Sequence, residues 1–126
     1  MTNDHGQTVA DVMSRPLETV AADAPVVEAA RHMREADVNG LFVPGATPGI
    51  VTTTDVVSLV ADERDPSDLA VEDVMTSPVE RVTTRMDLTE AAAMMTTYGI
   101  KHLPVVDEQG NYVGMLSSTD LAMEFA

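Results

Sequence analysis

Two carboxylates, Asp55 and Asp120, are placed where they could bind a ligand. Each follows a short apolar strand and lies in the first turn of an expected helix. Asp120 ends the stretch GMLSSTD (114–120), and Asp55 ends the matching stretch GIVTTTD (49–55). Such a carboxylate can accept charge-assisted hydrogen bonds from ligand hydroxyls, and the free N–H groups of a helix start favour phosphate. The same residues also cap a helix when no ligand is present. Both interpretations stay open, and the duplication predicts two related sites.

The turns belong to a repeat that covers nearly the whole chain. The stretch VADVMSRP (9–16) returns as VEDVMTSP (71–78), an offset of 62 residues, whereas Asp55 matches Asp120 at an offset of 65. The first copy is therefore three residues shorter, around 44–48. A repeat of this length predicts two similar lobes. A half of this size is marginal alone, so we expect the halves to share a core within one domain.

Hydrophobic spacing predicts the same order of elements in each half: strand, helix, strand, strand, helix. In the first half, a helical turn at 9–13 and an extended stretch at 17–20 precede a helix with Pro25 at its first position. Strands at 41–43 and 49–51 and a helix at 54–61 complete this half.

In the second half, Asp87 and Glu90 have the spacing of a capping box at the start of a helix that should end near Gly99. A hairpin of strands at 103–106 and 112–116 follows, and a closing helix runs from Ser118 or Thr119 toward Phe125. The expected boundaries are a disordered tail at 1–7, a first lobe at 8–61, a solvated linker at 62–69 and a second lobe at 70–126.

The composition excludes several classes of function. Seven basic and 21 acidic residues give a formal net charge of −14, which opposes direct binding to nucleic acid or to an anionic membrane. The chain has no cysteine, no run of apolar residues long enough to span a bilayer, no histidine spacing for a metal and no signal peptide at its start. We therefore expect a cytoplasmic protein without a metal. The dispersed acidity favours a surface adapted to concentrated salt over an ordinary acidic cytosolic protein.

Four motifs of the second half resemble the CBS domain, named after cystathionine β-synthase. They are DVMT (73–76), LTEA (88–91), IKHLPVVD (100–107) and GMLSSTD (114–120). The first half matches at DVMS (11–14), VVEA (26–29) and GIVTTTD (49–55), and departs where Phe42 takes the place of the family's proline. The chain is thus similar to a free-standing tandem CBS pair.

This resemblance implies an α+β fold of two βαββα lobes about a pseudo-twofold axis, with the sheets packed together and the helices outside. It implies two clefts between the lobes, each holding an adenosine-containing ligand: AMP, ADP, ATP or S-adenosylmethionine. Such modules sense a ligand, act on a partner protein, form homodimers and do not ordinarily catalyse a reaction. No cofactor with a catalytic role is expected.

The resemblance also implies roles for individual residues. Asp55 and Asp120 would accept the ribose hydroxyls, a charge-assisted arrangement. The hydroxyl residues expected beside a phosphate, and at the start of each lobe, are Thr52, Thr54, Ser117, Thr119, Ser14 and Thr76. Lys101 and His102 would supply cations, although His102 is equally readable as a solvent-facing residue at a strand start. Backbone groups near Ile100 and Pro104 would meet adenine. Because the first half has Asn39 and Gly40 in place of Lys101 and His102, the Asp120 site is favoured.

Three classes of function compete. A ligand-sensing regulatory module ranks first. An interaction or dimerisation module with degenerate sites ranks second, because Phe42 and the shortened first hairpin depart from the family pattern. An enzyme ranks last, since the sequence offers no nucleophile paired with a base, no glycine-rich phosphate loop and no metal-binding constellation.

Overall fold

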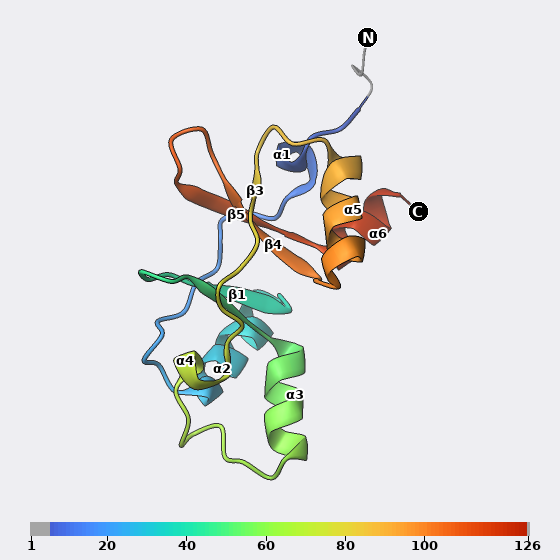
Figure 1. Ribbon diagram of the computed structural model, residues 1–126. Coiled ribbons are helices and arrows are strands. Elements are labelled where there is room, and N and C mark those ends of the chain that lie inside the picture. The colour runs from blue at the N-terminus through green and yellow to red at the C-terminus, as the bar shows by residue number, and fades with distance from the viewer. Residues whose placement is uncertain (1–5, 126) are drawn as a thin grey trace. The chain divides into compact units, whose positions relative to one another are not determined.

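The computed structural model describes residues 6–125 and divides the chain into two compact units (Figure 1). Unit 1 joins the N-terminal segment, up to Leu17, to residues 80–126, and unit 2 is residues 18–79. Each unit therefore takes a four-residue helix from the other half of the sequence repeat, residues 9–12 in unit 1 and residues 71–74 in unit 2. The packing units and the sequence halves are offset, although both halves contain the same motifs.

Unit 1 contains a three-stranded sheet and three helices. Its elements are α1 (Val9–Val12), β3 (Val82–Thr83), α5 (Leu88–Tyr98), β4 (His102–Val106), β5 (Tyr112–Ser117) and α6 (Ser118–Glu124). The strand order is β3-β4-β5, with β3 parallel to β4 and β4 antiparallel to β5. Leu103 lies opposite Leu116 in that hairpin. The hairpin, α5 and the closing helix confirm the predicted elements.

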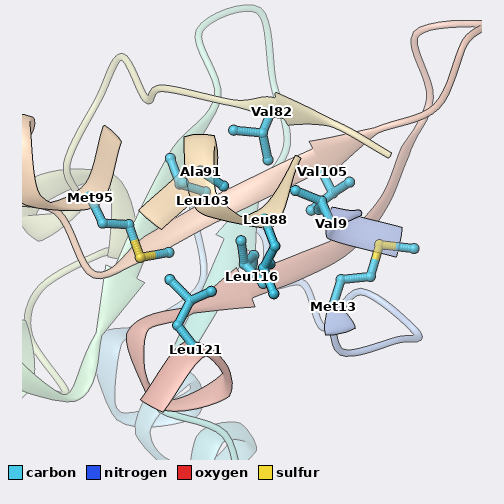
Figure 2. Packing of buried hydrophobic residues seen from close by; sticks show 10 residues of the cluster. All are labelled: Val9, Met13, Val82, Leu88, Ala91, Met95, Leu103, Val105, Leu116 and Leu121. Atoms are coloured by element: carbon cyan, nitrogen blue, oxygen red, sulfur yellow. The ribbon is translucent and has the colours of Figure 1, made fainter. Parts of the chain in front are cut away.

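The core of unit 1 draws on both halves of the repeat. Leu88, Ala91 and Met95 lie at the helical spacing i, i+3 and i+7, so α5 presents one apolar face to the sheet. Figure 2 shows these side chains gathered with those of the strands, of α6 and of the N-terminal residues Val9 and Met13. Val9 is fully buried. The N-terminal segment is thus an integral part of this unit.

Unit 2 repeats this arrangement on a smaller scale. Its elements are α2 (Val26–Ala36), β1 (Gly40–Val43), β2 (Gly49–Thr52), α3 (Thr53–Ala61) and α4 (Val71–Val74). The two strands are antiparallel, with Leu41 opposite Val51. Ala29 and Met33 of α2 pack with both strands and with Val71 of α4. The predicted helix and hairpin of the first half are confirmed.

Unit 2 differs from the prediction at its first strand. The stretch 17–20 forms only an isolated parallel bridge, between Thr19 and Phe42. Two backbone bonds hold it, from Val20 N–H to the Phe42 carbonyl and from Phe42 N–H to the Glu18 carbonyl, each 3.0 Å long. β1 has four residues, whereas β4 has five, because the first hairpin is shorter. The shorter strand leaves fewer backbone groups for a third strand to bond.

Both long helices begin differently from the prediction. The capping box at Asp87 is wrong, because its side chain makes no cap bond; instead Leu88 N–H donates to the Gln7 carbonyl at 2.9 Å. Pro25 is the N-cap of α2, one residue before the predicted position. The following N–H groups donate to carbonyls within the stretch 62–69, which folds back onto α2. Backbone carbonyls from distant segments thus accept from the first N–H groups of both helices, which have no partner within the helix.

The mixed α+β class is confirmed. Of the predicted tail at 1–7, residues 1–5 lie outside the described residues, and Gln7 is bonded to the start of α5. Within residues 6–125, no helix has the length and apolar character needed to cross a membrane.

Candidate functional site

The turn from β5 into α6 holds Asp120 in a capping box. Ser117 N–H donates to Oδ2 of Asp120 at 2.9 Å, and Asp120 N–H donates to Oγ of Ser117 at 3.1 Å. Ser117 is extended, with φ −114° and ψ 160°, as an N-cap residue is. This reciprocal pair fixes the carboxylate at the first turn of α6. The capping interpretation of the sequence is therefore realised.

The second oxygen of the Asp120 carboxylate faces a residue from the other end of the sequence. Ser14 Oγ donates to Oδ1 of Asp120 at 3.4 Å. The backbone of Ser14 forms an antiparallel bridge with Met115, with N–H to carbonyl distances of 2.8 and 3.0 Å. Asp120 is half-buried and Ser14 is exposed, so the pair lies at the surface of unit 1. The structure thus brings together two predicted site residues that are 106 positions apart.

Three other predicted residues of the second half lie at or next to the turn between β5 and α6. The carbonyl of Lys101 accepts a bond from Ser118 N–H at 2.9 Å, which places Lys101 at the start of α6 with an exposed side chain. His102 is half-buried and lies opposite Ser117 in the hairpin. Thr119 is exposed in the first turn of α6. Lys101, His102, Ser117 and Asp120 therefore belong to one small region.

Ile100 and Pro104 lie deeper. Ile100 is half-buried, packs against the core of unit 1 and donates its N–H to the Met95 carbonyl at 3.0 Å. Pro104 is fully buried, opposite Met115 in the β4–β5 hairpin. The side chain of Pro104 is thus part of the interior of unit 1.

Unit 2 carries the equivalent turn, from β2 into α3. Thr52 donates to Oδ2 of Asp55 twice, from its N–H at 2.8 Å and from its hydroxyl at 3.1 Å, and Asp55 N–H donates to Thr52 Oγ1 at 3.3 Å. Thr54 is exposed in the first turn of α3. Asn39 takes the place of Lys101, since its carbonyl accepts from Thr53 N–H at 3.0 Å. The Asp55 turn lacks the lysine of the Asp120 turn.

Thr76 occupies in unit 2 the place that Ser14 occupies in unit 1. It forms an antiparallel bridge with Ile50, with N–H to carbonyl distances of 2.9 and 3.0 Å. The predicted site residues therefore form two separate groups, one in each unit. Thr52, Thr54, Asp55 and Thr76 lie in unit 2, and the other eight lie in unit 1.

Sequence reasoning gave no role to two glycine–methionine contacts beside these turns. Gly114 lies against Met13, and Gly49 lies against Met75. Both pairs keep their positions in the repeat, which is the signal that would have found them. Each contact adjoins the bridge that holds Ser14 or Thr76.

The family profile of the CBS domain matches residues 9–62 and 71–126. These two matches cover most of the chain, which therefore belongs to the CBS domain family.

Relatives in several archaea share most of this chain. A 17.7 kDa protein of Acidianus ambivalens is 32% identical over 117 residues, 90% of this chain and 70% of that protein. Protein MK0525 of Methanopyrus kandleri is 30% identical, and the match covers 90% of this chain and 60% of that protein. A homoserine O-acetyltransferase of Methanocorpusculum labreanum is 34% identical over 92% of this chain but only 24% of its own length. The region shared with that enzyme is about a quarter of it.

Solved structures share the fold along nearly the whole chain. A protein with CBS domains from Burkholderia ambifaria is 32% identical with a TM-score of 0.84, over 94% of this chain and 93% of that one. The CBS domain pair of protein MJ0100, in complex with 5'-methylthioadenosine and S-adenosyl-L-methionine, is 27% identical with a TM-score of 0.83, over 95% and 96%. A hexameric CBS-CP12 protein of bloom-forming cyanobacteria is 25% identical with a TM-score of 0.89, over 95% and 68%.

Proposed function

We propose that this chain is a regulatory module that binds an adenosine-containing ligand at the Asp120 turn and acts on a partner protein. The observation that carries the proposal is the carboxylate of Asp120, whose Oδ1 accepts the hydroxyl of Ser14 at the long distance of 3.4 Å. The MJ0100 pair, a relative of similar length, was solved with two adenosine compounds. The ligand class is AMP, ADP, ATP or S-adenosylmethionine.

The two oxygens of Asp120 have different tasks in this proposal. Oδ2 is committed to the helix cap through Ser117 N–H at 2.9 Å. Oδ1 accepts one hydroxyl at a distance beyond the usual range of O–H···O bonds, which ends at about 3.0 Å. A ribose hydroxyl can replace or join Ser14 there with a shorter, charge-assisted bond. The fold therefore holds the carboxylate in place without using its full accepting capacity.

Neighbouring groups suit the rest of such a ligand. Lys101 is the single lysine of a chain with a net charge of −14, and it lies at the start of α6. Its ammonium group, with the hydroxyl of Thr119, would favour a phosphate near the ribose. The Asp55 turn has Asn39 instead of a lysine, so we propose that it binds phosphate-bearing ligands more weakly. Backbone groups near Ile100 would meet the adenine edge.

Regulation of a separate activity is the mode of action proposed here. The chain matches about a quarter of an acetyltransferase, which is consistent with a module that other proteins carry beside a catalytic region. We propose that the chain itself is not an enzyme, that it works in the cytoplasm, and that the protein it regulates responds to the ligand-bound form.

A thermal unfolding series tests this proposal. At 100 times its dissociation constant, a ligand should stabilise the folded state by about 2.7 kcal/mol. AMP, ADP, ATP, S-adenosylmethionine and 5'-methylthioadenosine are added separately at millimolar concentration, and at least one should raise the unfolding temperature. Asp120→Asn should at least halve that stabilisation. No rise with any of the five compounds would refute the proposal.

Asp107→Asn is the matched control. Asp107 lies in the same unit and, like Asp120, has a carboxylate that accepts backbone hydrogen bonds; its donors are Gln109 and Asn111 N–H, both at 2.9 Å. Those bonds close the β4–β5 turn, at the far end of the hairpin from Ser117. This variant should keep the ligand-induced rise, which separates a role of Asp120 in binding from a general effect of removing a carboxylate.

A second function, homodimerisation, is favoured by exposed apolar side chains on three helices. They include Met123 at 77% and Phe125 at 58% near the end of α6, Tyr98 at 58% on α5 and Val57 at 66% on α3. Single exposed apolar side chains are common, whereas neighbouring ones mark an interaction surface, so the proposal rests on Met123 and Phe125, two positions apart at the end of α6. Sedimentation velocity should show a dimer that Met123→Glu disrupts. A monomer for the unsubstituted chain at micromolar concentration would exclude this function.

A further inference from the structure

The segment that carries Ser14 packs against β5, and the segment that carries Thr76 packs against β2. Each strand has a glycine at the point of contact, Gly114 in β5 and Gly49 in β2. A Cβ atom on Gly114 would lie 2.8 Å from Sδ of Met13 and 2.9 Å from the carbonyl oxygen of Ser14. A Cβ atom on Gly49 would lie 2.5 Å from Sδ of Met75 and 2.9 Å from the carbonyl oxygen of Thr76. The same crowding thus occurs independently in both units.

We propose that Gly114 and Gly49 are positioning residues for the two candidate sites, because they let the Met13–Ser14 segment dock beside Asp120 and the Met75–Thr76 segment dock on β2, the strand that leads to Asp55. This inference deepens the proposed function and, for its ligand-binding consequence, rests on it. Neither glycine touches the ligand in this account. Each acts through the hydroxyl residue that its segment presents.

The contact with the Ser14 carbonyl oxygen explains why position 114 requires a glycine. A thioether is flexible, so Met13 could move its sulfur away from an added methyl group. The Ser14 carbonyl cannot move alone, because it accepts the 3.0 Å bond from Met115 N–H that closes the bridge to β5. Carbon atoms pack at about 3.5 Å or more from their neighbours, so an alanine at 114 would push the segment away by roughly 0.5 Å.

A displacement of that size is enough to separate the site residues of unit 1. The Ser14 hydroxyl already lies 3.4 Å from Asp120 Oδ1, and a longer separation is no longer a hydrogen bond. The two halves of the sequence repeat contribute one residue each to this pair. Gly114 therefore controls whether a segment from the N-terminal half reaches the carboxylate of the C-terminal half.

Hydrogen exchange of individual amides tests the docking without any ligand. In the unsubstituted chain, the amides of Ser14 and Met115 should be protected, as should those of Thr76 and Ile50. Gly114→Ala should lower protection of the first pair by at least about tenfold and leave the second pair unchanged. Gly49→Ala should do the reverse, so each variant is the matched control of the other.

Titration with S-adenosylmethionine and ATP then tests the consequence for binding. Gly114→Ala should weaken binding at the Asp120 turn by about tenfold or more. General destabilisation of the fold would instead weaken binding at both the Asp120 and the Asp55 turn. Unchanged protection at Ser14 and Met115 in Gly114→Ala would overturn the inference. So would fast exchange at those amides in the unsubstituted chain, a readout that needs no variant to fold. Absence of binding by the unsubstituted chain would instead refute the proposed function, and the exchange data would still decide the docking.

Discussion

Comparing Asp120→Ala with Asp120→Asn separates the structural and the binding roles of that carboxylate. The alanine substitution removes the bond from Ser117 N–H at 2.9 Å and the longer one from Ser14 Oγ at 3.4 Å. It also removes a negative charge from the first turn of α6. Asp120→Asn is the companion variant, because its amide oxygen can still accept from Ser117 N–H.

The magnitude follows from these contacts. A hydrogen bond to a charged group contributes about 1.5–3 kcal/mol net, and the half-buried position of Asp120 favours the lower end. The interaction of the carboxylate with the helix dipole adds about 0.5 kcal/mol. We expect Asp120→Ala to lower the free energy of unfolding by about 2 kcal/mol, and Asp120→Asn by about 1 kcal/mol or less.

Urea unfolding without ligand measures both values. Asp55→Ala should cost a similar amount, since Thr52 donates to Asp55 at 2.8 and 3.1 Å. Both asparagine and alanine at position 120 should at least halve the stabilisation by an adenosine compound at 100 times its dissociation constant for the unsubstituted chain. A change below about 0.5 kcal/mol in Asp120→Ala is typical of an unconstrained surface residue and would refute the capping geometry.

Three further perturbations test the packing and the charge of the chain. Leu103→Ala should lower the free energy of unfolding by about 2–5 kcal/mol in urea titration, because Leu103 is fully buried opposite Leu116; a loss below 1 kcal/mol would contradict the core described for unit 1. Glu18→Gln should cost only about 0.5 kcal/mol in the same titration, since the 2.8 Å pair between Glu18 and His32 is about one third exposed, and a loss several times larger would contradict this assignment as a surface pair. Raising KCl from 0.1 to 1 M should raise the unfolding temperature, because the Debye length falls from about 10 to about 3 Å and the repulsion within a chain of net charge −14 is screened; an unchanged or lower temperature would speak against repulsion as a destabilising factor.

Local patterns predicted the elements that local forces determine. The apolar stripe of α5 and its end at Gly99 follow from helical spacing, and the predicted β4–β5 hairpin follows from two apolar runs around a polar turn. The capping interpretation of Asp55 and Asp120 was readable from the hydroxyl residue three positions earlier. These features depend on residues within a few positions of one another.

Features that depend on contacts between distant segments could not be predicted from local sequence patterns. The two copies of the DVM motif look alike, so nothing in the sequence says that Val9 packs with the second half and Val71 with the first. The cap expected from Asp87 is not formed, and the bond at the start of α5 comes instead from Leu88 N–H to the carbonyl of Gln7, a residue about 80 positions away. The proximity of Ser14 to Asp120 came from the family resemblance, and the glycine–methionine contacts emerged only from coordinates.

Isothermal titration of this chain with AMP, ADP, ATP and S-adenosylmethionine tests the central claim most directly. We expect saturable binding of at least one compound to the unsubstituted chain and to Asp107→Asn, and a loss of affinity of about tenfold or more in Asp120→Asn. Absence of saturable binding by the unsubstituted chain, or equal affinity in Asp120→Asn, would contradict that claim.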